Sequence, residues 1–284
     1  MGAARILILG AGVFGALAAE ELRARGHVAA CVSRASGVDA RDAASVGRAL
    51  AGRDALLHAA GPFQEQRAGA ARAAADAGVP YVDLSDDRAF SERVGAVDAR
   101  TPLLTGMSTT PALAEALASR VGEGATCAMY VGGANRQGPA TMAFAARSRL
   151  DGPPLDVDFP RLGRRRAYPA RAFFDGPYYV AVGGVSGLGW RFRPLLRALA
   201  PVAARLPRLG RDTAGALVAM RGARREALVA RERGQRLAVL PAVWAIERAL
   251  AGEAPPRAAL PREWVDAEAL LAFVAASGVE RVSA

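Results

Sequence analysis

Three glycines near the N-terminus have a spacing that suits a bound pyrophosphate. Residues 10–15 read Gly-Ala-Gly-Val-Phe-Gly, between an apolar run at Ile6–Leu9 and a segment with helical spacing. In such a strand–turn–helix Gly10 permits the tight turn, Gly12 lets the backbone approach the phosphates, and Gly15 allows close helix–strand packing. The helix N-terminus also offers free N–H groups to the anion. The predicted dinucleotide contacts here are Gly10, Gly12, Val13, Phe14 and Gly15.

The end of the next apolar run indicates which dinucleotide is preferred. About 20 residues beyond such a glycine pattern, a carboxylate would bond the adenine ribose of NAD(H). This chain has Cys31-Val32-Ser33-Arg34 there instead. A hydroxyl followed by a guanidinium suits a 2′-phosphate, so Ser33 and Arg34 predict NADP(H) as the cofactor, with NAD(H) as the second choice. The alternative is that Arg34 is one more surface arginine of an arginine-rich chain.

Small residues follow a third apolar run, in the segment His58-Ala59-Ala60-Gly61-Pro62-Phe63. At the carboxyl end of a strand such residues leave room for a cofactor in the crevice beyond the sheet. The predicted cofactor contacts in this segment are Ala60, Gly61, Pro62 and Phe63. His58 lies inside the apolar run, which favours a buried neutral imidazole over a catalytic acid.

Two polar segments after the following strands are candidates for substrate chemistry. In Tyr81-Val82-Asp83-Leu84-Ser85-Asp86-Asp87, Asp86 and Asp87 are the catalytic candidates, and an N-cap of the next helix is the competing interpretation. The segment 105–111 presents hydroxyls and helix N–H groups, with Ser108 and Thr109 as candidate substrate contacts. A plain helix start explains that segment equally well.

These residues can meet only if the first part of the chain folds as a parallel sheet covered by helices. Continuous apolar runs predict buried strands, and the stretches between them have helical or alanine-rich spacing. The chain therefore predicts an α/β fold, a Rossmann-type doubly wound parallel sheet. The predicted strands are Arg5–Leu9, Val28–Ser33, Ala55–Ala60, Tyr81–Leu84 and Leu103–Thr105, and the predicted helices are Phe14–Arg25, Ala43–Ala51, Gln66–Ala77 and Arg88–Ala99.

The pattern changes after residue 105, where we expect a mixed α/β domain. Helices are predicted at Pro111–Val121, Ala242–Ala251 and Ala267–Ala276, and strands at Thr126–Val131, Ala227–Arg231 and Arg236–Val239. Residues 141–150 are ambiguous, 151–189 suggest short strands and turns, and 190–205 read as a basic amphipathic helix. The predicted division is 1–110 for the Rossmann domain, 111–240 for the substrate or cover domain, and 241–284 for a C-terminal helical segment that packs back on the first domain.

Composition excludes several kinds of chemistry. All 37 basic residues are arginine, so every mechanism that needs a lysine is excluded. The two cysteines, Cys31 and Cys127, offer neither a disulfide framework nor a metal site. Residues 161–236 hold 17 arginines against four carboxylates, an excess of +13. This excess indicates a small-molecule substrate that is anionic, an anionic surface, or a merely solvated face.

The same sequence gives limited support for membrane or nucleic-acid partners. No uncharged apolar run reaches the ~18–20 residues that span a bilayer; residues 6–19 imitate a secretory signal, but their glycine pattern favours a cytoplasmic protein. Trp190–Arg211 mixes apolar residues with six arginines, which allows peripheral membrane contact, although its prolines interrupt a continuous helix. No nucleic-acid reading motif accompanies the basic stretch, and the oligomeric state is not predicted.

Taken together, these segments resemble the saccharopine dehydrogenase-like oxidoreductases. The shared features are the glycine loop 10–15, Ala59–Phe63, Gly78–Asp87 and Gly106–Pro111. The similarity extends over residues 5–150 and returns after Pro255-Pro256, and it is poor between 151 and 236. It implies an NADP-binding Rossmann domain with a mixed α/β domain, and hydride transfer to or from an imine, a secondary amine or an activated double bond.

The absence of lysine is a departure from that family. Its lysine-forming members are described with a Lys/His catalytic pair, and the short-chain dehydrogenases use a Tyr-x-x-x-Lys pair; this chain can form neither. The resemblance therefore supplies cofactor positions but no catalytic residue. The alternatives to an NADP-dependent enzyme of unknown substrate are a non-catalytic NADP(H)-binding redox sensor and a peripheral membrane or lipid-linked reductase.

Overall fold

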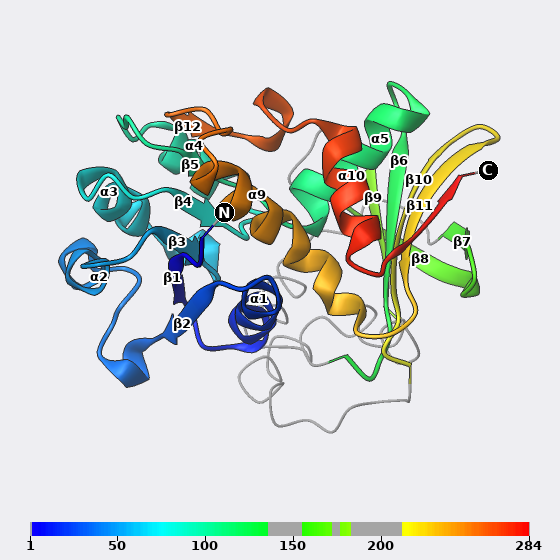
Figure 1. The fold of residues 1–284 in the computed structure, drawn as a ribbon. Coiled ribbons are helices and arrows are strands. Elements are labelled where there is room, and N and C mark those ends of the chain that lie inside the picture. The colour runs from blue at the N-terminus through cyan, green and yellow to red at the C-terminus, as the bar shows by residue number, and fades with distance from the viewer. Residues whose placement is uncertain (1, 136–154, 172–176, 183–211, 284) are drawn as a thin grey trace. The chain divides into compact units, whose positions relative to one another are not determined.

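The computed structural model describes residues 2–135, 155–171, 177–182 and 212–283 (Figure 1). The chain divides into two compact units. Unit 1 comprises Met1–Ala112 and Ala238–Val265, and unit 2 comprises Leu113–Leu237 and Asp266–Ala284. Each unit is built on its own β-sheet.

Unit 1 contains a six-stranded sheet in which every pairing is parallel. The second strand of the chain, β2, lies on one side of the first strand, β1, and the later strands lie on the other side. The direction in which strands are added to the sheet therefore reverses at β1. This is the doubly wound arrangement that the sequence predicts. The order across the sheet is β2 (Val28–Val32), β1 (Arg5–Leu9), β3 (Ala55–His58), β4 (Tyr81–Asp83), β5 (Leu103–Leu104) and β12 (Ala258–Ala259).

Helices cover this sheet, whose strands β1 and β3 contain buried apolar runs. The core residues Ile6–Leu9 and Ala55–Leu57 are at most 1% exposed. The helix α1 (Val13–Ala24) packs on β1, β2 and α9 (Leu240–Leu250), which in turn contacts β3 and β4. The helix α3 (Gly69–Asp76) contacts β4 and α2 (Ala43–Ala49), and α4 (Arg88–Gly95) contacts β12.

Capping residues mark several helix ends of unit 1. The Asp42 side chain accepts a hydrogen bond from the Ala44 N–H at the start of α2, as an N-cap does. Gly26 and Gly78 follow α1 and α3 with left-handed φ angles of 86° and 65°, as expected of glycines that terminate helices. These caps end the helices close to the strands that follow them.

Unit 2 contains the predicted mixed α/β arrangement. Its seven-stranded sheet is antiparallel except for the parallel pairing of β6 with β9. The helix α5 (Ala114–Val121) packs on β6, β10 and β11 and contacts α10 (Ala267–Ala276). The strand order is β13 (Glu280–Ser283), β11 (Arg224–Ala230), β10 (Gly215–Arg221), β6 (Thr126–Val131), β9 (Pro177–Val182), β8 (Gly163–Arg171) and β7 (Leu155–Phe159).

Residues on alternate positions of these strands form a second core. Tyr130, Ala216 and Val229 belong to a cluster with Val157 and Phe159 from the β7–β8 hairpin. Cys127 precedes the cluster residue Ala128 in β6 and points to the opposite face of the sheet, where its thiol donates a hydrogen bond to the Ala114 carbonyl of α5 at 3.5 Å. The alternation of strand side chains therefore separates a helix-covered face from a hairpin-covered face.

One predicted strand is wrong. Arg236–Val239 does not extend a sheet; Gly234–Ala238 forms a 3-10 helix that leads directly into α9. The reason is local, because Pro241 lies in the first turn of α9, where its fixed φ favours helix initiation. The ambiguous segment 141–150, most of 151–189 and the amphipathic stretch 190–205 lie outside the described residues.

Candidate functional site

The carboxyl edge of the unit 1 sheet collects the predicted site segments, and the glycine loop lies at its centre. Gly10 has a φ of 106° and is held by its N–H bond to the Val32 carbonyl of β2, at 2.8 Å. A Cβ on Gly10 would lie 2.8 Å from the Ala60 nitrogen. A Cβ on Gly15 would lie 1.8 Å from the Gly10 oxygen. Both glycines therefore let the loop after β1 pack tightly against its neighbours.

Gly12 differs from these two glycines because nothing fills the space beside it. A Cβ there would meet no atom within 4 Å, and the residue is exposed at the N-cap of α1. No side chain caps this helix end, and its first turn contains no acidic residue. The N–H groups of the first turn are thus available to an anion, and the helix dipole favours negative charge at this position.

Ser33 and Arg34 follow β2, the strand beside the glycine loop. The Ser36 hydroxyl accepts a hydrogen bond from the Ser33 N–H at 2.8 Å and donates to the Ser33 carbonyl at 2.9 Å. This short turn fixes the backbone and presents Arg34 at the surface. The Ser33 side chain takes part in a capping box with Ser36, whereas the Arg34 guanidinium has no hydrogen-bond or ion-pair partner among the described residues.

The segment after β3 contacts the glycine loop through its backbone. Gln66, whose role the sequence did not reveal, donates through Nε2 to the carbonyls of Ala60 and Pro62 and so holds the segment in place. Gly61 is exposed, and Pro62 is half-buried. Phe63 is only 8% exposed, and its ring lies 5.0 Å from those of His58 and Phe90. The Phe63 side chain therefore belongs to the core, which leaves its backbone for a cofactor contact.

His58 is fully buried at the end of β3. Its Nδ1 lies 3.0 Å from the Tyr81 hydroxyl. Burial lowers the pKa of His58 to about 4, so the imidazole is neutral near pH 7. This environment agrees with the expected structural role of His58 and leaves it without access to a substrate.

Asp83 joins the two polar segments that follow β4 and β5. Its Oδ1 accepts hydrogen bonds from the N–H groups of Ser85 and Gly106, each at 2.9 Å, and its carbonyl accepts one from Met107. Burial raises the pKa of Asp83 to about 6 despite these donors. The sequence places Asp83 in a polar segment but does not show this linking role, which depends on the pairing of distant strands.

The structure separates the roles of Asp86 and Asp87. The Asp87 Oδ1 accepts a hydrogen bond from the Phe90 N–H at 2.7 Å, so Asp87 is the N-cap of α4. Asp86 is half-buried and does not cap the helix. Burial raises the pKa of Asp86 to about 7, and the negative charge of Asp87 adds to that shift. A carboxyl group that titrates near neutral pH is suited to donating or accepting a proton.

Ser108 and Thr109 are 7% and 6% exposed. Thr109 opens a π-helical turn at Thr109–Leu113 that leads into α5, and the Ala112 N–H donates to the Ser108 carbonyl. Both residues therefore occupy the helix start that was the alternative interpretation. Their contact with a substrate stays a prediction.

Neither a metal-binding cluster nor a membrane-spanning helix is present in the part of the chain that the structure describes. There, no three His, Cys, Asp or Glu side chains gather in a way that could hold a metal ion. No helix within these same ranges combines the length and the hydropathy that a membrane span requires.

Comparisons with known proteins give structural similarity alone. No family model and no curated protein matches the sequence. Similar solved structures include a dehydrogenase (MviM) from Clostridium difficile, with 8% identity, a TM-score of 0.40, and coverage of 96% of this chain and 99% of that chain. KijD10, a 3-ketoreductase from Actinomadura kijaniata crystallised with NADP and TDP-benzene, has 14% identity, a TM-score of 0.41, and coverage of 96% and 95%.

A third similar structure is the myo-inositol dehydrogenase from Lactobacillus casei in complex with NAD(H) and myo-inositol. It has 10% identity and a TM-score of 0.40, and the match covers 99% of this chain and 97% of that chain. Similarity at these values does not assign a family or a substrate. The geometry of the site itself is therefore the basis for a functional assignment.

Proposed function

We propose that unit 1 binds NADP(H) and that the protein is an NADP-dependent oxidoreductase similar to the saccharopine dehydrogenase-like family. The observation that carries the proposal is the exposed start of α1, where Gly12 leaves open space beside unsatisfied N–H groups. A structural turn alone explains Gly10 and Gly15, which pack against backbone atoms. It does not explain a glycine at position 12.

The order of the loops along the sheet edge supports a position for each part of the dinucleotide. The glycine loop after β1 would hold the pyrophosphate, with Arg34 after β2 on one side and Ala60–Pro62 after β3 on the other. The adenosine half, with its 2′-phosphate, would then lie toward Arg34. The nicotinamide half would lie toward β3 and β4, where Asp86 follows the strand.

When bound, NADP(H) would supply or accept a hydride. The carbon that exchanges the hydride belongs to an imine, a secondary amine or an activated double bond, and its neighbouring atom must gain or lose a proton. We assign that proton to the Asp86 carboxyl group, since Asp87 is engaged as a helix cap and His58 is buried. The nearby backbone is fixed by Asp83, which we regard as a positioning residue.

Cofactor choice is tested by replacing Arg34. Wild-type protein is expected to bind NADPH more tightly than NADH, and Arg34→Ala should remove most of that difference. A charge-assisted hydrogen bond contributes ~1.5–3 kcal/mol, so NADPH affinity should fall by roughly 10- to 100-fold while NADH affinity changes little. Fluorescence titration measures both. Arg48→Ala, at an exposed position in the last turn of α2, removes the same charge and should preserve the preference; equal wild-type affinities would refute it.

The raised pKa of Asp86 predicts how stability depends on pH. Because the folded pKa of about 7 lies above the ordinary value of 3.8, the native state holds more protons than the unfolded state between those pH values. The contribution of Asp86 to stability is therefore present below pH ~4 and is lost as the pH rises through 7. Asp83, with a folded pKa of about 6, acts in the same direction.

We expect Asp86→Asn to flatten this loss, as measured by urea unfolding at a series of pH values from 4 to 8. The exposed Asp76→Asn on α3 is the control and should reproduce the wild-type profile. An Asp86→Asn profile parallel to the wild type would show that Asp86 ionises normally, and the proposed proton transfer would lose its basis.

A non-catalytic NADP(H) sensor is the second candidate, and one observation favours it. His58 has no access to a substrate, and the chain has no lysine, so Asp86 is the single proton donor that we assign. The two functions differ in turnover. An enzyme should consume NADPH absorbance in the presence of cyclic imines or enones, and Asp86→Asn should abolish this loss without changing NADPH binding. Tight NADPH binding without turnover of any of these compounds would favour the sensor. The stretch Trp190–Arg211, on which membrane docking depended, lies outside the described residues.

A further inference from the structure

Two arginines of the basic segment 161–236 form ion pairs with one carboxylate of unit 2. Arg161 and Arg231 both form ion pairs with Glu280, at 2.9 and 3.0 Å. Each of these guanidinium groups is therefore matched, at least in part, by a carboxylate of the same unit. These two arginines are therefore not evidence that unit 2 binds an anion from solution.

The exposed face of the β7–β8 hairpin is balanced in a similar way. Arg164 lies opposite Asp158, and Arg166 lies opposite Asp156, in the antiparallel ladder. All four side chains are exposed, and opposite charges facing one another across a ladder are mildly stabilising. This part of the basic segment is a solvated face of mixed charge.

The β10–β11 hairpin shows the opposite arrangement. Arg221 and Arg224 face each other directly in its ladder. Like charges in this position are destabilising, and no ion pair neutralises either of them among the described residues. The Arg221 Nη1 atom lies only 2.7 Å from where a Cβ on Gly122 would be, so its guanidinium lies at the C-terminal end of α5.

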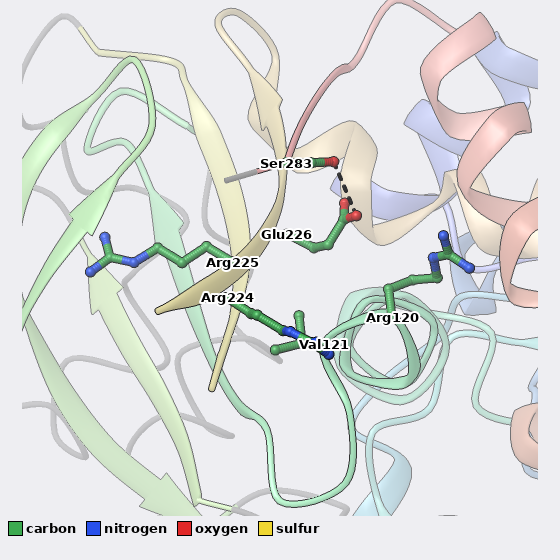
Figure 2. A pocket seen from close by; sticks show the side chains of 6 residues that line it. All are labelled: Arg120, Val121, Arg224, Arg225, Glu226 and Ser283. Atoms are coloured by element: carbon green, nitrogen blue, oxygen red, sulfur yellow. Dashed lines mark hydrogen bonds between the residues drawn. The ribbon is translucent and has the colours of Figure 1, made fainter. Parts of the chain in front are cut away.

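A third arginine approaches the same place from α5. Arg120 is in the last turn of that helix, and it lines a hollow of about 370 Å³ together with Arg224. Figure 2 shows the Arg224 side chain extending toward Val121, while Arg225 extends the opposite way. The C-terminal end of a helix attracts cations, but its partial charge cannot balance three guanidinium groups.

Two carboxylates near this hollow, Glu226 and Glu268, are already engaged. The Glu226 carboxylate accepts hydrogen bonds from the Ser283 hydroxyl at 3.0 Å, drawn in Figure 2, and from Arg281 at 3.4 Å. Glu268 pairs with Arg120 at 3.6 Å and also with Arg281. Arg120 and Arg281 thus pair with these two carboxylates, and Arg221 and Arg224 add two positive charges that no ion pair balances among the described residues.

We propose that this hollow is a binding site for a small anionic molecule that carries phosphate or carboxylate groups. The planar guanidinium fork binds both groups through paired hydrogen bonds. The volume lies within the range of ~300–1,000 Å³ found for small-molecule pockets, which suits a ligand larger than a bare ion. An anion held between Arg221 and Arg224 would also relieve their mutual repulsion. All lining residues belong to unit 2, so this site shares no residue with the proposed dinucleotide site.

The test is calorimetric titration of the full chain at low salt with two probes, inorganic pyrophosphate and citrate. The experiment uses Gly12→Val protein, in which the glycine loop can no longer accept pyrophosphate. We expect at least one probe to bind, and Arg221→Gln together with Arg224→Gln to weaken it at least about tenfold, since charge-assisted bonds are lost. Arg164→Gln with Arg166→Gln removes the same charge from the hairpin face and should have little effect.

The double variant should fold, because it removes a repulsion, and its melting temperature should equal or exceed that of its parent. The single Arg224→Gln variant should show a smaller loss of affinity. Stronger binding of pyrophosphate would identify phosphate groups as the ligand chemistry, and stronger binding of citrate would identify carboxylates. Binding of neither probe, or equal weakening by the two double variants, would overturn the proposal. Wild-type binding of NADPH is measured separately, so either proposal can fail alone.

Discussion

Replacing Gly12 by valine is expected to abolish NADPH binding, with an affinity loss of more than about 100-fold, while the protein still folds. The new methyl groups would occupy the open space above the start of α1, where the pyrophosphate is expected to approach. The backbone tolerates the change, since Gly12 has a φ of −80° and a ψ of −166°, which suits β-branched residues. An N-cap valine costs about 1 kcal/mol or less relative to glycine, so thermal unfolding should change by only a few degrees.

The control for this variant is Gly95→Val. Gly95 is also exposed, and a Cβ there would meet nothing within 4 Å, but it lies at the far end of α4 from the site segments. NADPH affinity should stay at the wild-type value. Normal NADPH binding by Gly12→Val would show that the glycine pattern had been misread as a phosphate loop.

Replacing Gly15 by alanine is expected to destabilise unit 1 severely. A Cβ at this position would lie 1.8 Å from the Gly10 oxygen, and a backbone atom cannot move aside without opening the turn between β1 and α1. We expect a loss of at least about 3 kcal/mol, among the largest effects of single substitutions. Urea unfolding measures this loss, and the melting temperature should fall by ~6–12 °C.

The two substitutions separate structure from function within one motif. Gly15→Ala should reduce stability and Gly12→Val should reduce binding. An alanine variant at position 15 that is as stable as wild type would contradict the close packing of the turn, and with it the geometry from which the site is derived.

Local signals predicted much of unit 1. The apolar run Arg5–Leu9 has the observed bounds of β1, and the predicted helix Ala43–Ala51 corresponds to α2 (Ala43–Ala49). What the sequence could not supply was non-local pairing. The short β12 adds to the first sheet from residue 258, more than 150 positions beyond its neighbour β5, and two residues give no periodicity to detect.

The candidate site shows the same limit. From the sequence, the adjacent carboxylates Asp86 and Asp87 are both candidates for capping and for chemistry, and only the hydrogen bond from the Phe90 N–H assigns the cap to Asp87. The linking role of Asp83 depends on contacts with a segment 23 residues away. The opposed pair Arg221 and Arg224 depends on the register of β10 with β11, and β10 was not predicted. The spacing of residues in the sequence indicates which side chains could take part in chemistry or binding. The register of the strands determines which of these side chains lie close together.

The central claim, that unit 1 binds NADP(H), is tested most directly by titrating wild-type and Gly12→Val protein with NADPH and NADH in parallel. The predicted result is saturable NADPH binding by the wild type, weaker NADH binding, and no detectable binding of either by a folded Gly12→Val variant. Absence of dinucleotide binding by the wild type, or identical titrations of the two proteins, would contradict it.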